Sequence, residues 1–113
     1  MSQVTNLIIT LDAMENLNSI ITKLHSFGDQ DRPFNIVSVK DSSLPNDWYG
    51  GSKRLECNIL IGAYNYLNLD DLITFMRTEI NYNNPEVVQL IVNEQFDLKF
   101  RMIDLFPITL PDF

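Results

Sequence analysis

The residue types that most often carry enzyme chemistry are scarce in this sequence. His25 is the only histidine among the 113 residues. Catalysis or zinc binding would need a partner histidine, cysteine or carboxylate at a suitable spacing, and His25 stands in no such motif. We therefore expect His25 to be structural or solvated, and the chain not to be an enzyme, with no catalytic residue, metal or cofactor. An acid–base pair made from carboxylates or tyrosines distant in sequence stays open.

Cys57 is the only cysteine, so an internal disulfide is impossible and a reducing compartment fits. Free cysteines are among the most often buried side chains, whereas a reactive thiol needs an exposed, electropositive setting. We therefore expect Cys57 in the core. No basic region precedes the short apolar run 7–11, and no apolar stretch reaches the roughly 20 residues of a membrane helix. The chain is expected to be cytoplasmic.

The most distinctive segment is Asp-Trp-Tyr-Gly-Gly-Ser-Lys at residues 47–53. Its glycines and lysine lack the Walker spacing and would lead into a strand instead of a helix, so phosphate binding is not expected. Trp48 and Tyr49 are the kind of aromatic anchors that protein interfaces use. They would equally suit a lid that folds back over the sheet, and both interpretations stay open.

Fifteen acidic residues against eight basic ones give the chain a net charge of −7. Nucleic-acid binders normally carry the opposite sign, so direct binding to nucleic acid or to an anionic membrane is not expected. An acidic surface suits a basic protein partner, although the same charge also keeps a small protein soluble. The close pair Asp29 and Asp31 could contact such a partner, and it lacks the further oxygen ligands of a calcium loop.

Apolar spacing and turn residues predict five strands and two helices in one α+β domain spanning residues 1–113, with an irregular tail at 107–113. The order is that of the ferredoxin-like split βαβ pattern (βαββαβ) with an extra C-terminal hairpin strand, an antiparallel sheet carrying two helices on one face. The predicted strands are 4–11, 34–40, 54–64, 86–93 and 98–102, and the predicted helices are 13–27 and 69–80. A long connection is predicted at 41–53.

Local signals predict how these elements begin and end. Asp12 and Glu15 form a capping box for the first helix, in which Met14 joins the buried stripe, and Gly28 ends it in the left-handed conformation. Asn68 caps the second helix. In two predicted strands, the alternation of residue types indicates which side chains face the core and which face solvent. The core side of strand 54–64 is expected to hold Leu55, Cys57, Ile59, Ile61 and Ala63, and in the last strand Leu98, Phe100 and Met102 alternate with exposed Lys99 and Arg101.

Three segments resemble a group of small uncharacterised bacterial proteins: 47–57, which contains Trp-Tyr-Gly-Gly-Ser-Lys, Gly-Ala-Tyr-Asn-Tyr-Leu at 62–67, and Val-Gln-Leu-Ile-Val-Asn-Glu-Gln at 88–95. This resemblance implies no established activity. In size and acidity the chain is also similar to immunity proteins that accompany polymorphic bacterial toxins.

We therefore expect a protein-binding module that neutralises a basic toxin domain. The expected contact residues are the acidic Asp29, Asp31, Asp41 and Asp47, with Trp48 and Tyr49 as apolar anchors. The alternative is a homodimeric ferredoxin-like domain that binds a small molecule, which is an inference from fold alone.

Overall fold

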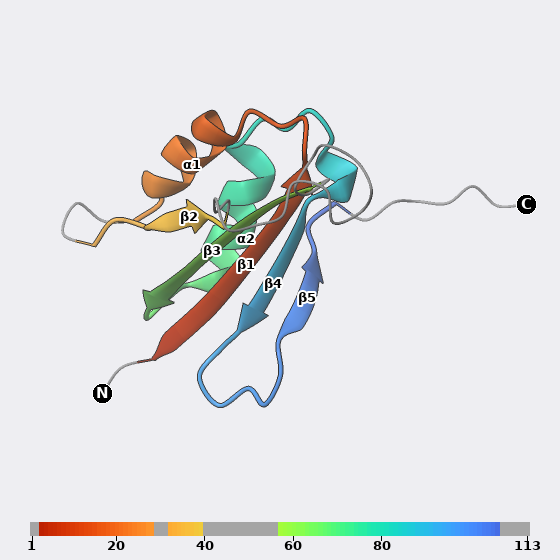
Figure 1. Cartoon of the computed structure of the whole chain (residues 1–113). Coiled ribbons are helices and arrows are strands. Elements are labelled where there is room, and N and C mark those ends of the chain that lie inside the picture. Colours follow the sequence, from red (N-terminus) through yellow and green to blue (C-terminus); the bar gives the residue numbers. More distant parts are fainter. Residues whose placement is uncertain (1–2, 29–31, 40–56, 107–113) are drawn as a thin grey trace, which may run out of the picture.

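The computed structural model describes residues 3–28, 32–39 and 57–106. These residues form an α+β structure with two helices and one five-stranded antiparallel sheet, as the sequence predicted (Figure 1). A short 3₁₀ helix, η1 (Pro85–Val87), precedes the fourth strand. The helices are α1 (Leu17–His25) and α2 (Leu69–Thr78), and the strands are β1 (Val4–Asp12), β2 (Ile36–Ser38), β3 (Cys57–Asn65), β4 (Gln89–Asn93) and β5 (Arg101–Asp104).

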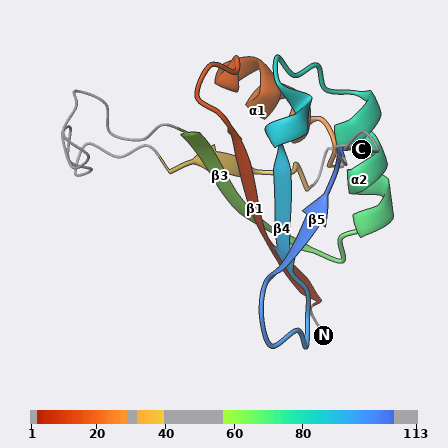
Figure 2. The same cartoon turned by 90° about the vertical axis from the view of Figure 1, so that its right-hand side faces the viewer.

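The sheet has the strand order β2-β3-β1-β4-β5, so the first strand of the chain is its centre. β1 pairs with β3 from Val4 opposite Asn65 to Asp12 opposite Cys57. β4 lies on the other side of β1, and β5 pairs antiparallel with β4 at the edge. Both helices lie on the same side of the sheet when the molecule is viewed from its edge (Figure 2).

The core lies between this sheet face and the two helices. Leu7, Ile9 and Leu11 alternate along β1 and are buried, because their side chains point toward the helices. Ile20 and Leu24 of α1 pack into the same cluster, together with buried residues of α2, β3 and β4. Each such side chain contributes about 1.5–3 kcal/mol through burial.

The predicted cap, first residue and buried stripe of α2 are confirmed, and the helix ends at Thr78, two residues before the predicted end. Asn68 is the N-cap, and its side-chain oxygen accepts a hydrogen bond from the backbone N–H of Asp71 at 3.1 Å. Asp70 and Asp71 occupy the first turn, where the helix dipole favours negative charge. The apolar stripe faces the sheet, with Leu72 and Met76 fully buried. Neither α2 nor α1 is long and apolar enough to cross a membrane, and no other helix of the described part is.

The predicted start of α1 is wrong. The helix begins at Leu17 with Asn16 as its cap, whose side chain accepts a hydrogen bond from the Ser19 N–H. Asp12 remains in β1, and Met14 is 77% exposed instead of buried. The capping box fails because Glu15 turns away from the helix, toward the connection between α2 and β4.

Gly28 follows α1, but its backbone does not adopt the left-handed conformation that the sequence predicted. The glycine is required by close approach instead. A Cβ atom at this position would lie 2.4 Å from the carbonyl oxygen of Arg32 and 2.5 Å from the backbone nitrogen of Phe34. A tight backbone contact therefore selects glycine here.

The predicted faces of two strands are reversed. In β3 the buried residues are Asn58 and Leu60, whereas Ile61 lies on the face away from the helices and is exposed. In β5 and just beyond it, Ile103 and Leu105 pack on the core, and Met102 is exposed. Alternation separates two faces of a strand, but only the position of the helices decides which face is buried.

Candidate protein-interaction site

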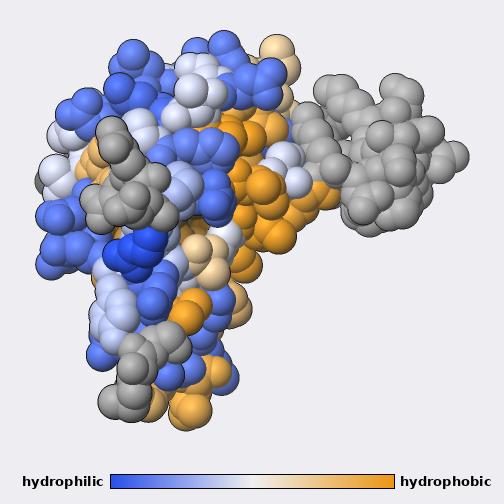
Figure 3. Space-filling view, turned by 90° about the vertical axis from the view of Figure 1, so that its left-hand side faces the viewer, coloured by the Kyte–Doolittle hydropathy of each residue, from blue (hydrophilic) through white to orange (hydrophobic). Residues whose placement is uncertain are grey.

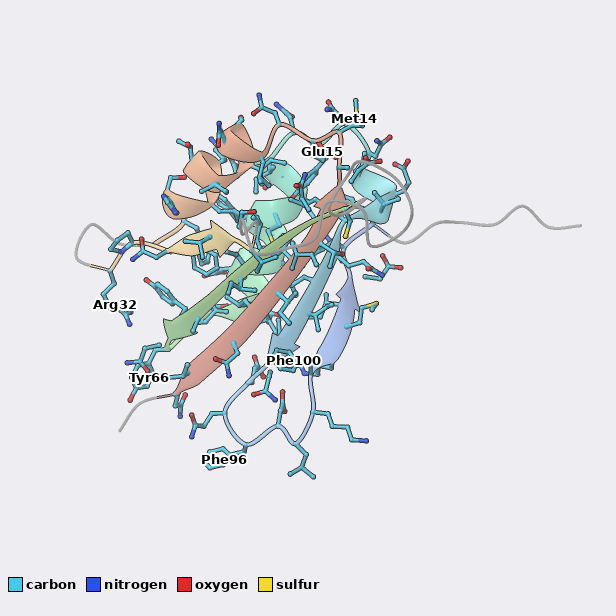
Figure 4. The ribbon with its side chains drawn as sticks, viewed as in Figure 1. Met14, Glu15, Arg32, Tyr66, Phe96 and Phe100 are labelled. Carbon is cyan, nitrogen blue, oxygen red and sulfur yellow. The ribbon has the colours of Figure 1, made fainter. Side chains whose placement is uncertain are left out.

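The loop between β4 and β5, residues 94–100, holds three exposed hydrophobic side chains, Phe96, Leu98 and Phe100, of which the first two are almost entirely in solvent. Phe96 is 90% exposed and Leu98 is 99% exposed. Figure 4 shows Phe96 at the tip of this loop, projecting away from the rest of the molecule. Large apolar side chains with this exposure contribute almost nothing to the stability of the fold, because they bury no apolar surface. They are the type of residue that anchors protein interfaces.

Polar contacts within the loop fix its shape. The carboxylate of Asp97 accepts a hydrogen bond from the backbone N–H of Glu94 at 2.9 Å, and the Asp97 N–H donates back to the Glu94 carbonyl at 2.9 Å. The Arg101 guanidinium pairs with Glu94 at 2.8 Å and with Asp97 at 3.4 Å. Exposed ion pairs are individually weak. Together with the backbone hydrogen bonds, however, they favour one conformation of the turn.

Two aromatic residues at this end of the molecule have left-handed backbone conformations. Phe96 has φ 74° and Tyr66, just beyond β3, has φ 58°. Residues other than glycine pay about 1–2 kcal/mol for this conformation. Both rings line one small hollow of about 190 Å³, which Gln3 and Thr5 also line. Backbone strain at exposed aromatic residues favours a functional interpretation. We call Tyr66, Phe96 and Leu98 the loop site.

A second apolar surface lies on the face of the sheet turned away from the helices. Strand pairing aligns one apolar residue from each strand in a continuous row across the whole sheet. Figure 3 shows hydrophobic side chains gathered on one side of the molecule in a view from the β2 edge. We call this set the apolar row: in sheet order, Val37, Ile61, Ile8, Ile91 and Met102.

A buried carboxylate near the opposite end of β1 has a structural role. Glu15 accepts hydrogen bonds from the backbone N–H groups of Asn83 at 2.7 Å and Asn84 at 2.9 Å. The Asn84 side chain also donates to the carboxylate of Asp12 at 2.9 Å. These contacts join the β1–α1 connection to the α2–β4 connection. Both Glu15 oxygens are occupied by backbone donors, so this cluster is a tether and not a candidate acid–base pair.

The histidine and cysteine lie apart from these surfaces. His25 is the last residue of α1, and its Nε2 is 3.4 Å from the backbone carbonyl oxygen of Ile36. Cys57 is the first residue of β3 and is half-buried, not in the core as predicted, because it lies on the sheet face away from the helices. Within the ranges that the structure describes, no group of three His, Cys, Asp or Glu residues gathers as metal ligands would.

Every contact residue predicted from the sequence lies outside the described residues: Asp29, Asp31, Asp41, Asp47, Trp48 and Tyr49. The segment 40–56 joins the described chain at Val39 and at Cys57, which pairs with Asp12. The loop site lies at the other end of β1, where Asn6 pairs with Asn93. The segment 40–56 and the loop site are therefore attached to opposite ends of the sheet, whereas Asp29 and Asp31 precede Arg32, which donates to the Asn65 carbonyl at the end where the loop site lies.

The loop site itself was missed by the sequence analysis. Residues 94–97 fell between the predicted strands 86–93 and 98–102, and Leu98 and Phe100 were assigned to one side of the second of these strands. The available signal was the proximity of Phe96 and Leu98 to a turn, which makes regular burial of both unfavourable. The chain matches no family model, no curated protein and no solved structure, so its function has to be inferred from its own residues.

Proposed function

We propose that this chain is a non-enzymatic protein-binding module of the immunity or inhibitor type, which neutralises a basic protein partner in the bacterial cytoplasm. The observation that carries the proposal is the loop site. Phe96 and Leu98 are almost fully exposed on a turn that polar contacts hold in one shape. A preformed turn loses little conformational entropy on binding, so more of the contact energy is realised as affinity.

The charge of the chain supports a basic partner. The net charge is −7, and carboxylates stand close to the loop site. Asp70 and Glu94 line a groove beside it, together with Tyr66 and Arg101. Carboxylates around an apolar anchor would accelerate encounter with a positively charged protein and orient it, while the rings would slow dissociation.

We further propose that the architecture is the ferredoxin-like split βαβ fold with β5 added as a hairpin strand. The support is the order β1, α1, β2, β3, α2, β4, β5 along the chain and the placement of β3 and β4 on either side of β1. Domains of this architecture serve many functions, so the fold by itself does not select one.

The alternative is a homodimeric regulatory domain that binds a small molecule. One observation favours it. An open groove of about 700 Å³ between α1 and the end of α2 is lined by polar side chains, including Ser19, Lys23 and Glu79. Polar groups of both charges could orient a small polar ligand. A thermal shift on titration with a metabolite panel, lost in Lys23→Ala, is the result expected from this alternative.

The test of the main proposal is affinity capture from the native host, followed by calorimetry with the purified partner. We expect Phe96→Ala/Leu98→Ala to weaken partner binding by at least about 30-fold, the effect of truncating a hot spot. The matched control is Met14→Ala/Val87→Ala, which truncates two exposed apolar side chains elsewhere and should leave affinity within about twofold.

A second double variant, Trp48→Ala/Tyr49→Ala, distinguishes the anchors predicted from the sequence from the loop site. If only this variant loses affinity, the partner is contacted through the segment predicted from the sequence and the loop site is not involved. If neither variant differs from the control, the proposed anchors are wrong. Capture of no partner beyond the background of an unrelated acidic protein would contradict the function itself.

A further inference from the structure

We propose that two copies of this chain pair face to face through the apolar row. This inference goes beyond the proposed function, since it concerns a surface separate from the loop site and a second copy instead of a foreign partner. Ile8 faces Ile61 on one side and Ile91 on the other, and Val37 and Met102 extend the row to both edges. Val37 is 56% exposed and Met102 is 60% exposed.

On β1 and β4, the polar residues beside the row are neutral and paired with one another; the charged neighbour of the row is Asp104 of β5, in register with Gln89. Thr10 Oγ1 donates to Gln89 Oε1 at 3.1 Å, and Asn6 Nδ2 lies 3.5 Å from Asn93 Oδ1. Gln89 Nε2 also lies 3.2 Å from the sulfur of Met102. Burial of side chains that already have hydrogen-bond partners costs less than burial of unpaired polar groups. The flanks of the row on β1 and β4 can therefore be covered without new polar partners.

The distribution of charge on the chain indicates which molecule is expected to cover the apolar row. The chain carries a net charge of −7, yet the row and the hydrogen-bonded pairs beside it contain no charged residue; the carboxylates on this face are Asp104, two residues beyond Met102, and Asp12, four residues beyond Ile8. A basic partner would find little to complement here. A second copy of this acidic chain would be repelled by most of the molecule's surface. The two copies could meet at the apolar row without placing like charges in contact there.

The arrangement of the row also suits a two-fold axis. Ile8 is at the centre of the row on the central strand, with two apolar residues on each side. An axis parallel to β1 would place Ile8 on its own copy, Ile61 on the copy's Ile91, and Val37 on the copy's Met102. Such an interface is self-complementary, and two sheets pack in this way about 10 Å apart.

The area of the sheet face that would be buried predicts a weak dimer. Five strands about 4.8 Å apart and about six residues long, at about 3.3 Å per residue, give a footprint of about 480 Å² per copy. Two copies would bury about 960 Å², below the range of about 1,200–2,000 Å² for stable interfaces. We therefore expect a dimer that dissociates in the micromolar range, with a Kd of about 10 μM to 100 μM.

The test is sedimentation velocity of the full 113-residue chain from about 1 to 500 μM, a range that brackets the expected Kd. We expect a shift from monomer to dimer with rising concentration. Val37→Glu and Met102→Glu should each raise the dimer Kd at least about tenfold, because each places a charge in the interface. Val87→Glu and Met14→Glu add the same charge to exposed apolar residues off this face and should leave the Kd within about threefold.

Circular dichroism and thermal unfolding at low concentration confirm that each variant is folded. A chain that stays monomeric at the highest concentration would overturn the proposal. Equal weakening by the control variants would also overturn it, since net charge and not the row would then govern association. If the wild type is monomeric and the two face variants lose thermal stability, a segment of the same chain covers the row. If the face variants lose only foreign-partner binding, the row belongs to that partner.

Discussion

Tyr82 illustrates how a single side chain acquires its properties from the residues packed around it in the fold. Its hydroxyl donates to the backbone carbonyl of Met76 at 3.0 Å, and its ring meets Phe106 edge to face. Burial raises the pKa of the phenol above its ordinary value of 10, and the nearby Glu15 carboxylate raises that pKa further. Both effects disfavour the phenolate in the folded state.

Replacement of Tyr82 by Phe is therefore expected to have a pH-dependent effect. At pH 7 the variant should lose about 1 kcal/mol of unfolding free energy with the Met76 hydrogen bond. A phenol whose pKa is raised by folding stabilises the protein fully below the unfolded pKa, and this contribution is lost as the pH rises beyond it. The advantage of the wild type should thus shrink by up to about 1.4 kcal/mol per pH unit above pH 10.

Urea unfolding of both proteins at pH 7 and pH 11 measures this difference directly. Comparison of the two proteins at each pH cancels the titration of groups that they share. A difference in unfolding free energy that stays constant over this range would show that Tyr82 ionises equally in the folded and unfolded chains.

Among the elements, the β4–β5 loop shows the clearest conflict between local stability and exposure. Phe96 has a positive φ and Leu98 does not, while both side chains are almost entirely in solvent. A glycine at position 96 would adopt the same backbone conformation without a clash of its side chain. Phe96 therefore lowers the stability of the fold, and a role of its side chain in binding would explain why it is present.

The expected result of Phe96→Gly is a gain in stability with a loss of binding. Relief of the left-handed strain should raise the unfolding free energy by about 0.5–1 kcal/mol, while affinity for the captured partner falls. Leu98→Gly is the matched control, because it removes an equally exposed side chain where φ is not positive, and it should lower stability slightly. The opposite ranking in denaturant midpoints would mean that the turn is not strained at Phe96.

At the scale of the whole molecule, the two proposed surfaces differ in their electrostatic character. The loop site lies among carboxylates at one end of the sheet, whereas the apolar row and the polar pairs beside it contain no charged residue. Association with a basic partner is an attraction between opposite charges, whereas pairing of two chains of charge −7 works against net repulsion.

Ionic strength should therefore change the two associations in opposite directions. Between about 50 and 500 mM NaCl, partner affinity should fall about tenfold or more, because screening weakens attraction between exposed charges. Over the same range the dimer should become about two- to fivefold tighter, since screening reduces repulsion and leaves apolar burial intact. Calorimetry for the partner and sedimentation for the dimer test this, and parallel changes would place both associations on one surface.

The sequence by itself determined the fold class and the local details that depend on neighbouring residues. The apolar spacing over residues 69–80 identified α2, and Asn68 was correctly identified as its cap, since a cap and its N–H partner lie within one helical turn. β1 and β4 were likewise evident from their apolar residues, although the residues just before β4 form η1 instead of strand.

Only the tertiary structure decided the features that depend on distant segments. Glu15 satisfies backbone N–H groups at residues 83 and 84, so a partner far along the chain removed it from the helix start where its spacing placed it. The apolar residues of β3 looked like a core face, yet the helices pack on the other side and Ile61 remains exposed. Strand alternation defines two faces without naming the buried one. That choice depends on long-range packing, and it created the apolar row; the loop site is exposed because Phe96 and Leu98 lie beyond the last β4–β5 pair, Val92 with Arg101.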